Sequence, residues 1–128
     1  MKPFQTFVMS MAVLLLAATP PQAQSDEEVI SGKELLQTCV SESTSLTDGK
    51  PFCLRYLAGL VVTVSQIQEQ DPGTRLFCVN PQQVSLEEVH QTVVKSLKEN
   101  SERLNEDAYV LVSEALHRKY PCAPPAPQ

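Results

Sequence analysis

Residues 84–100 read VSLEEVHQTVVKSLKEN, and this stretch indicates a helical fold class. Ser85 and Glu88 stand three positions apart, as in a capping box, where each side chain bonds the backbone N–H of the other residue at a helix start. The apolar residues that follow recur every three or four positions, which is the spacing of one helix face. A helix is therefore predicted to begin after Ser85 and to end at Asn100. Its buried face is predicted to hold Leu86, Val89, Val93 and Leu97.

Three further helices are predicted outward from this one. Ser31 and Glu34 form another capping box, so a helix is predicted to start there and to end near residue 40. Pro51 suits the first turn of a helix that continues to a turn at residues 71–73. No alternating strand pattern with hairpin turns occurs. Four helices with short connections predict an all-α fold, a small four-helix up-down bundle.

The last predicted helix has polar signals at its start. Asn105 is predicted to cap this helix, and Glu106 and Asp107 in its first turn complement the positive end of the helix dipole. Glu114 and Arg118 stand one turn apart further along, so an ion pair within the helix is predicted between them.

Residues 1–23 have the features of a secretory signal peptide. Lys2 supplies a positive charge near the start, and the apolar run over residues 7–18 is shorter than the roughly 20 residues that span a bilayer. The sequence therefore predicts export to the periplasm and no membrane segment in the mature protein. A mature helical domain is predicted over residues 24–122, followed by a disordered tail over residues 123–128.

All four cysteines lie in the predicted mature part. An even number of cysteines in an exported protein is typical of disulfides. In the predicted bundle, Cys39 ends one helix and Cys53 starts the next, whereas Cys78 precedes the third helix and Cys122 follows the fourth. Of the three possible connectivities, only Cys39–Cys53 with Cys78–Cys122 pairs cysteines that share one end of the bundle. The fold is therefore predicted to be stapled by these two disulfides.

Composition excludes several classes of function. The chain carries 10 Lys+Arg against 15 Asp+Glu, a net charge of −5, which disfavours binding to the phosphate backbone of a nucleic acid. No glycine-rich phosphate-binding motif occurs, so no nucleotide cofactor is predicted. The two histidines, without H-x-x-x-H or C-x-x-C spacing, predict no metal site. No cofactor of any kind is expected.

Catalytic residues are not predicted either. A cysteine beside His90 or His117 would offer a nucleophile and a base, but disulfide formation removes the thiolate. His90 is predicted at the boundary of a buried face with one hydrogen bond, and His117 in solvent. The acidic pairs Glu87-Glu88 and Glu106-Asp107 lie in first turns of helices, where capping and the helix dipole account for them. The sequence therefore predicts a binding protein and not an enzyme.

Acidic side chains are concentrated in two connections, residues 41–50 and residues 99–107. In an up-down bundle both connections lie at one end, so their carboxylates would form a charged docking surface for a basic protein partner. The alternative is an ordinary solvated surface. The residues predicted to bind the partner are Glu42, Asp48, Glu102, Glu106 and Asp107.

The predicted helix over residues 51–70 is apolar on two sides. The stripe predicted to face the core holds Cys53, Tyr56, Leu57, Leu60, Val64 and Ile67. A second stripe, on another side of the helix, holds Leu54, Ala58, Val61 and Val62. Because a helix that is apolar nearly all round is buried on both sides, the second stripe is predicted to pack against a second copy in a homodimer. The alternative is that the first and fourth helices cover it within one subunit.

Several motifs of this chain occur together in a known family. They are LLQTC at 35–39, FCLRYLAG at 52–59, LFCVNP at 76–81 and YPC at 120–122. With this combination, the chain resembles the Rap/Tai family of immunity proteins over about residues 31–122. The resemblance implies a small exported helical protein that binds a peptidoglycan amidase delivered by type VI secretion and blocks its active site. The alternative function is a small periplasmic structural or acid-stress chaperone-like protein.

Overall fold

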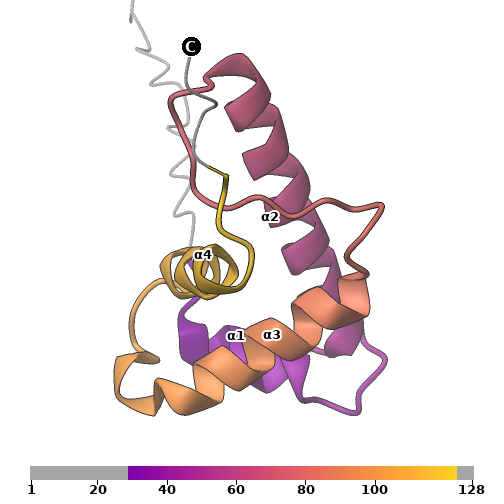
Figure 1. Ribbon diagram of the computed structural model, residues 1–128. Coiled ribbons are helices and arrows are strands. Elements are labelled where there is room, and N and C mark those ends of the chain that lie inside the picture. The colour runs from indigo at the N-terminus through magenta and orange to yellow at the C-terminus, as the bar shows by residue number, and fades with distance from the viewer. Residues whose placement is uncertain (1–28, 124–128) are drawn as a thin grey trace, which may run out of the picture.

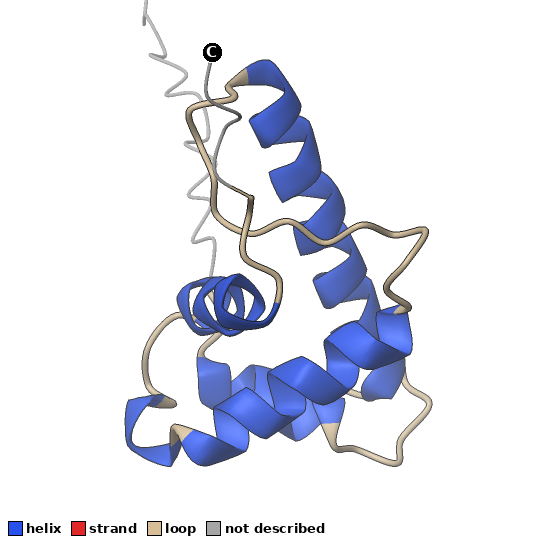
Figure 2. Ribbon diagram, in the orientation of Figure 1, coloured by secondary structure: helices blue, strands red, loops and turns tan. Residues whose placement is uncertain are grey.

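Four α-helices and two disulfides organise residues 29–123, the part of the chain that this computed structural model describes (Figure 1 and Figure 2). The elements are α1 (Gly32–Cys39), α2 (Lys50–Gln70), α3 (Leu86–Glu99), a 3₁₀-helix η1 (Ser101–Arg103) and α4 (Ala108–Lys119). These residues contain no strand, only an isolated β-bridge between Ser31 and Asp107. The predicted all-α, four-helix fold with two disulfides is confirmed. The predicted signal peptide over residues 1–23 lies outside the described residues, as does the tail beyond Ala123.

The helices cross one another around a common core. Figure 1 shows α3 lying in front of α1, α2 rising away from both, and α4 seen end-on. α1 packs against each of the other three helices, and α3 also packs against α2 and α4. The C-terminal half of α2 extends past the other helices, and the connection over residues 71–85 crosses it. Ile67 lies in this half and is 43% exposed, so the prediction that it faces the core is wrong.

The capping box predicted for α1 is confirmed, whereas at α3 one of the two predicted hydrogen bonds is found in the described residues. At the start of α1, the N–H of Glu34 donates to Ser31 Oγ (3.2 Å), and the N–H of Ser31 donates to Glu34 Oε2 (2.8 Å). These hydrogen bonds with Ser31 hold the pKa of Glu34 below its usual value. At the start of α3, the N–H of Glu88 donates to Ser85 Oγ (3.1 Å). Asn100 ends α3, as predicted.

The start of α4 differs from the prediction. Asp107, and not Asn105, occupies the N-cap position, and its side chain makes no capping hydrogen bond. The N–H of Ala108 donates instead to the carbonyl oxygen of Ile30 (2.9 Å). The segment before α1 thus accepts a hydrogen bond from an N–H group that a capping side chain would otherwise accept from. A tertiary contact therefore takes the role of the local cap.

One face of each helix and two residues of the α2–α3 connection, Phe77 and Val79, make the core. The helix residues that are less than 2% exposed include Leu35, Leu57, Val93, Leu97, Val112 and Leu116. Val89, Val93 and Leu97 of α3 are buried as predicted, whereas Leu86, the first residue of α3, is exposed. Phe77 lies in the connection between α2 and α3, yet it is the largest fully buried side chain in the described residues. Helical spacing does not predict its burial.

Candidate functional site

Both disulfides join helix ends, with the predicted pairing. Cys39–Cys53 links the last residue of α1 to the first turn of α2. Cys78–Cys122 links the α2–α3 connection to the chain after α4. The predicted connectivity is confirmed, and each cysteine of residues 29–123 is bonded, so none supplies a thiolate to a Cys/His nucleophile pair.

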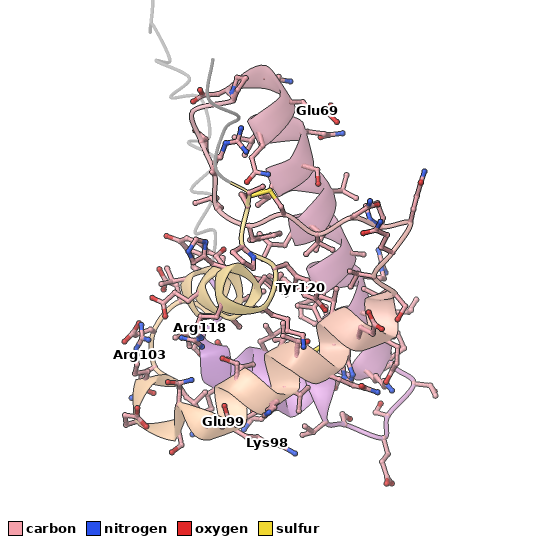
Figure 3. The ribbon with its side chains drawn as sticks, viewed as in Figure 1. Glu69, Lys98, Glu99, Arg103, Arg118 and Tyr120 are labelled. Carbon is pink, nitrogen blue, oxygen red and sulfur yellow. A yellow bond between two sulfur atoms is a disulfide. The ribbon has the colours of Figure 1, made fainter. Side chains whose placement is uncertain are left out.

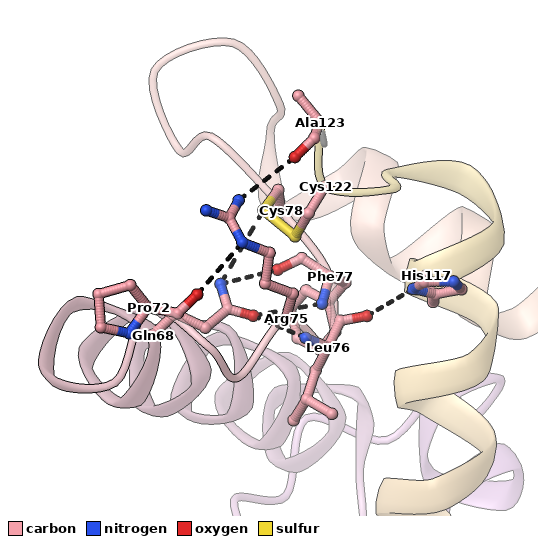
Figure 4. Close-up of a disulfide and its surroundings, with 9 residues drawn as sticks. All are labelled: Gln68, Pro72, Arg75, Leu76, Phe77, Cys78, His117, Cys122 and Ala123. Carbon is pink, nitrogen blue, oxygen red and sulfur yellow. Dashed lines mark hydrogen bonds between the residues drawn. A yellow bond between two sulfur atoms is a disulfide. The ribbon is translucent and has the colours of Figure 1, made fainter. Parts of the chain in front are cut away.

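The segment before Cys78 is held between α2 and α4 (Figure 4). From α2, Gln68 Oε1 accepts from the N–H of Leu76 (2.9 Å), and Gln68 Nε2 donates to the carbonyl oxygen of Phe77 (3.1 Å). From α4, His117 Nδ1 donates to the carbonyl oxygen of Leu76 (2.7 Å). His117 is exposed, as predicted, but its ring also anchors this connection. The disulfide therefore closes a segment that is already tied to both helices.

The acidic residues predicted to bind a partner fall into two groups in the structure. All five are exposed: Glu42, Asp48, Glu102, Glu106 and Asp107. The first two follow α1, and the other three precede α4. Because α1 runs alongside α3, the loop after α1 lies near the start of α3, and the turn before α4 lies near its end (Figure 1). The two groups therefore lie at opposite ends of α1 and do not form one continuous surface.

Contacts at the two ends of α1 hold this arrangement. Lys50 Nζ, at the start of α2, lies 4.0 Å from Glu87 Oε2 in the first turn of α3. At the start of α1, the N–H of Gly32 donates to the carbonyl oxygen of Glu106 (2.9 Å). The loop after α1 is thus held beside the start of α3, and the turn before α4 beside the start of α1.

Arg103 of η1, labelled in Figure 3, binds one acidic side chain of α4 and one of the turn before it. Its guanidinium donates to both carboxylate oxygens of Glu106 (2.9 and 2.8 Å) and to both of Glu114 (2.7 and 3.1 Å). Within residues 29–123 the predicted ion pair between Glu114 and Arg118 is not formed, and Arg118 donates to Ser96 Oγ (2.8 Å). Glu114 pairs with Arg103 and not with Arg118, because the planar guanidinium of Arg103 donates two hydrogen bonds to each of two carboxylates. Glu106 is therefore neutralised within the subunit.

Arg103 also makes stability depend on pH. Its hydrogen bonds and charge hold the pKa values of Glu106 and Glu114 below the ordinary value of 4.5. Such carboxylates stabilise the fold above their unfolded pKa, and the contribution is lost as pH falls through the lowered folded pKa.

We expect Arg103→Gln to lower the free energy of unfolding near pH 7. Below about pH 4.5 the variant should lose less additional stability than the wild type, because it has already lost this contribution. Urea unfolding of both proteins across this range measures the difference, and parallel pH profiles would contradict it.

The second stripe of α2 borders a groove. Ala58, Val61 and Val62 line an apolar groove of about 150 Å³ beside α2. The opposite wall comes from the α2–α3 connection and the start of α3, with Val79, Pro81, Val84, Leu86 and Val89. Leu54, the remaining residue of the stripe, lines a neighbouring groove next to Cys39. Val62 is 55% exposed. The opposite wall has a sequence signal of its own. Residues 76–84, LFCVNPQQV, are rich in apolar side chains although they lie in a connection, which indicates that part of this connection packs against a helix.

An aromatic residue is exposed beside the acidic group that precedes α4. Tyr109 lies in the first turn of α4, two residues after Asp107. Burial first, and then the charge of Asp107, raises the pKa of Tyr56 in α2. Tyr109 is missed by an analysis of apolar spacing because it lies off the buried face of α4. An aromatic residue two positions after the acidic pair Glu106-Asp107, at a helix start, is the sequence signal that indicates it.

Comparison with known proteins assigns most of the chain to a family model. The model of the Rap1a immunity proteins matches residues 31–122, a range that includes all four helices and both disulfides. No curated protein matches the chain. In the part of the chain that the structure describes, no helix is both long enough and apolar enough to cross a membrane.

Proposed function

The chain belongs to the Rap1a immunity proteins, and on this premise we propose that it protects the cell that makes it from a peptidoglycan amidase delivered by type VI secretion. The observation that carries this proposal is the family match over residues 31–122. In this function the protein acts by binding alone. It covers the active site of the amidase so that peptidoglycan cannot enter, and it makes or breaks no covalent bond.

The proposed place of action is the periplasm, where peptidoglycan lies. Two disulfides in a small helical domain support an oxidising compartment. The predicted signal peptide over residues 1–23 would direct the export. Export matters because an effector that attacks periplasmic peptidoglycan must be neutralised in the same compartment.

We place the amidase contact on Glu102, Asp107 and Tyr109, beside the start of α4. Both carboxylates are exposed, and within residues 29–123 neither forms a salt bridge. Tyr109 adds an exposed aromatic ring, the kind of residue that dominates binding energy at protein interfaces. The carboxylates would complement a basic partner and speed the encounter. Glu106 contributes less because Arg103 already binds its carboxylate.

Reversing both Glu102 and Asp107 to lysine is expected to slow association with a basic amidase by about tenfold at low salt, because electrostatic steering is lost. The difference should shrink near 1 M salt, where the screening length is about 3 Å. Stopped-flow measurement of the association rate tests this. The matched control is Glu42→Lys with Asp48→Lys, the same charge change at the other end of α1. If association slows in the control variant alone, the amidase binds at Glu42 and Asp48 instead. If neither variant changes the association rate, the acidic residues do not contribute to binding.

Growth protection tests the proposed function itself. The partner is sought among amidases encoded next to the gene of this chain. A bacterium that produces such an amidase in its periplasm is expected to grow when the full chain is co-produced, and not when residues 1–23 are deleted. The purified protein is expected to inhibit peptidoglycan hydrolysis stoichiometrically. Failure to bind any neighbouring amidase, with broad suppression of client aggregation on acidification, would favour the acid-stress chaperone alternative.

We further propose that two copies pair through the second stripe of α2. The apolar groove beside Val62 supports this pairing. A Cβ added at Gly59 in α2 would meet nothing within 4 Å, so there is open space on this helix for another backbone to approach. A two-fold axis would place α2 against α2 and bury the stripe of both copies.

Val62→Glu is expected to convert the dimer into a folded monomer. The side chain is 55% exposed in one subunit, so the fold tolerates a carboxylate there, whereas the dimer would bury it. The dimer Kd should rise about tenfold or more, which corresponds to about 1.4 kcal/mol. Sedimentation equilibrium and circular dichroism measure mass and folding. Ile67→Glu, on an exposed part of α2 outside the groove, is the control and should stay dimeric. A wild-type mass equal to the monomer at micromolar concentration would refute the pairing.

A further inference from the structure

A buried histidine lies against the first disulfide. His90 of α3 is 8% exposed. Among residues 29–123 it is the one polar or charged residue that is buried. One of its ring nitrogens and the sulfur atoms of Cys39 and Cys53 all lie within 4.8 Å of one another. The three residues come from three different helices, so no spacing motif in the sequence signals that they meet.

The hydrogen bonding of His90 determines which ring nitrogen is free. Nε2 lies 2.9 Å from the carbonyl oxygen of Cys39. A carbonyl oxygen only accepts, so Nε2 carries the proton and donates it. In the neutral ring, Nδ1 then presents an unprotonated lone pair. Nδ1 is buried and has no hydrogen-bond partner in the described residues, an arrangement that proteins normally avoid.

A carboxylate approaches the same nitrogen from the preceding turn of α3. Glu87 Oε1 lies 3.7 Å from His90 Nδ1, which is too far for a hydrogen bond. The Glu87 side chain is half-exposed and also approaches Lys50 Nζ at 4.0 Å, so it is not committed to the ring. The free Nδ1 therefore has one movable carboxylate beside it, and the ring as a whole lies against the two sulfur atoms.

We propose that reduction of Cys39–Cys53 creates a zinc site with both cysteine sulfurs and His90 Nδ1 as ligands. The Glu87 carboxylate or a water molecule completes the tetrahedron. Two thiolates, an imidazole and an oxygen are a typical ligand set for Zn²⁺. The donation from Nε2 to a backbone carbonyl is the support that metal-bound histidines usually have, because it sets the tautomer and orients the ring. In the disulfide state the sulfurs are bonded to each other, so the site exists only after reduction.

The chemistry balances with a dithiol as reductant. The dithiol supplies two electrons and two protons and becomes a disulfide, while the bond between Cys39 and Cys53 is cleaved to two thiols. Zn²⁺ then displaces the two thiol protons to solvent. Cys39 is 2% exposed and Cys53 0%, so the disulfide lies just beneath the surface. Cys39 borders a surface groove of about 550 Å³, together with the loop after α1 and with Lys50, Pro51 and Leu54, and this groove is the entry route for the reductant and the metal.

Cysteine alkylation of the wild-type mature protein provides the first test. The protein is reduced anaerobically with a phosphine, which is then removed, and it is alkylated with and without one equivalent of Zn²⁺. Zinc is expected to slow alkylation of Cys39 and Cys53 at least tenfold, and to leave Cys78 and Cys122 unprotected. Titration should show one zinc per reduced chain and none per oxidised chain. Equal protection of both pairs, or of neither, would overturn the proposal.

Cobalt titration tests the role of the histidine. Reduced wild type with Co²⁺ is expected to show the absorption of thiolate-bound tetrahedral cobalt. His90→Gln should weaken zinc binding at least tenfold, whereas His117→Gln, the control, should bind as the wild type does. Unchanged zinc affinity in folded His90→Gln would overturn the assignment of Nδ1. If His90→Gln does not fold, alkylation of the wild type still decides whether the site exists. Neither experiment involves an amidase, so both are independent of the proposed immunity function.

Discussion

Phe77→Ala is expected to destabilise the protein by about 3–5 kcal/mol, the range for deleting a buried phenylalanine ring. Phe77 is 1% exposed and belongs to the same core cluster as Leu57 and Leu116, although it comes from a connection. Gln68 holds the backbone at Phe77 through hydrogen bonds. The connection therefore cannot move inward to fill the cavity, and we expect the full cost of an unfilled cavity.

Leu76→Ala is the matched control for this prediction. Leu76 is the neighbouring residue, and its N–H also donates to Gln68 Oε1, but its side chain is 44% exposed. Its removal is expected to change stability by no more than about 0.5 kcal/mol. Urea unfolding measures both values, provided that the m-value is unchanged. Equal losses in the two variants would show that the ring of Phe77 is not part of the core.

Removing Cys78–Cys122 is the second change with a large expected effect. Its cysteines are separated by 44 positions, against 14 for Cys39–Cys53. In the chain-entropy model, the longer loop contributes about 4 kcal/mol and the shorter loop about 3 kcal/mol, both as upper values. Replacing both Cys78 and Cys122 by alanine should therefore destabilise the protein by about 2–4 kcal/mol, and by more than the same change at Cys39 and Cys53.

The loss should be visible first in α4. Without the disulfide, the chain after α4 keeps contacts such as the hydrogen bond from the N–H of Cys78 to the carbonyl oxygen of Tyr120 (2.9 Å) but loses its covalent link to the α2–α3 connection. Amide hydrogen exchange is expected to become faster in α4 than in α1, because the freed end opens locally. A larger loss of stability in the Cys39–Cys53 variant, or uniform exchange across both helices, would contradict this prediction.

Local signals predict the helices because each signal acts within one or two turns. Ser31 and Ser85 accept hydrogen bonds from the N–H groups of the residues three positions on, as their capping boxes predict. The disulfide pairing needs only the order of the helices and the short connection between α1 and α2, and it is confirmed as well. These features survive any rearrangement of the helices that keeps neighbouring ends together.

Predictions fail where the partner of a residue lies far away in the sequence. Asn105 does not cap α4, because the carbonyl oxygen of Ile30 already accepts from the N–H of Ala108. Glu114 binds Arg103 from η1, and not the residue one turn further along its own helix. In each case the pattern along one helix predicts a reasonable contact, but a group from a distant part of the chain has better geometry and forms the contact instead.

For the candidate binding residues, the sequence predicts that their side chains are exposed, but it does not predict how they are arranged in space. Their side chains are exposed, as a docking surface requires, yet α1 lies along α3 and separates the loop holding Glu42 from the turn holding Asp107. The stripe of α2 around Val62 is identified by its spacing, whereas the wall opposite, around Pro81, depends on the course of a connection without regular structure. Spacing along a helix reveals which face is apolar, and it does not reveal which segment lies opposite.

Read without coordinates, the order of residues establishes the all-α class, the capping of α1 and α3, the disulfide pairs and the family resemblance. These rest on periodicity, on hydrogen bonds that span a single turn and on the order of neighbouring helix ends. The burial of Phe77, the neutralisation of Glu106 and the meeting of His90 with Cys39–Cys53 depend on the crossing of the helices. Helix crossing brings together groups that are far apart in the chain, and no local pattern encodes the distance between them.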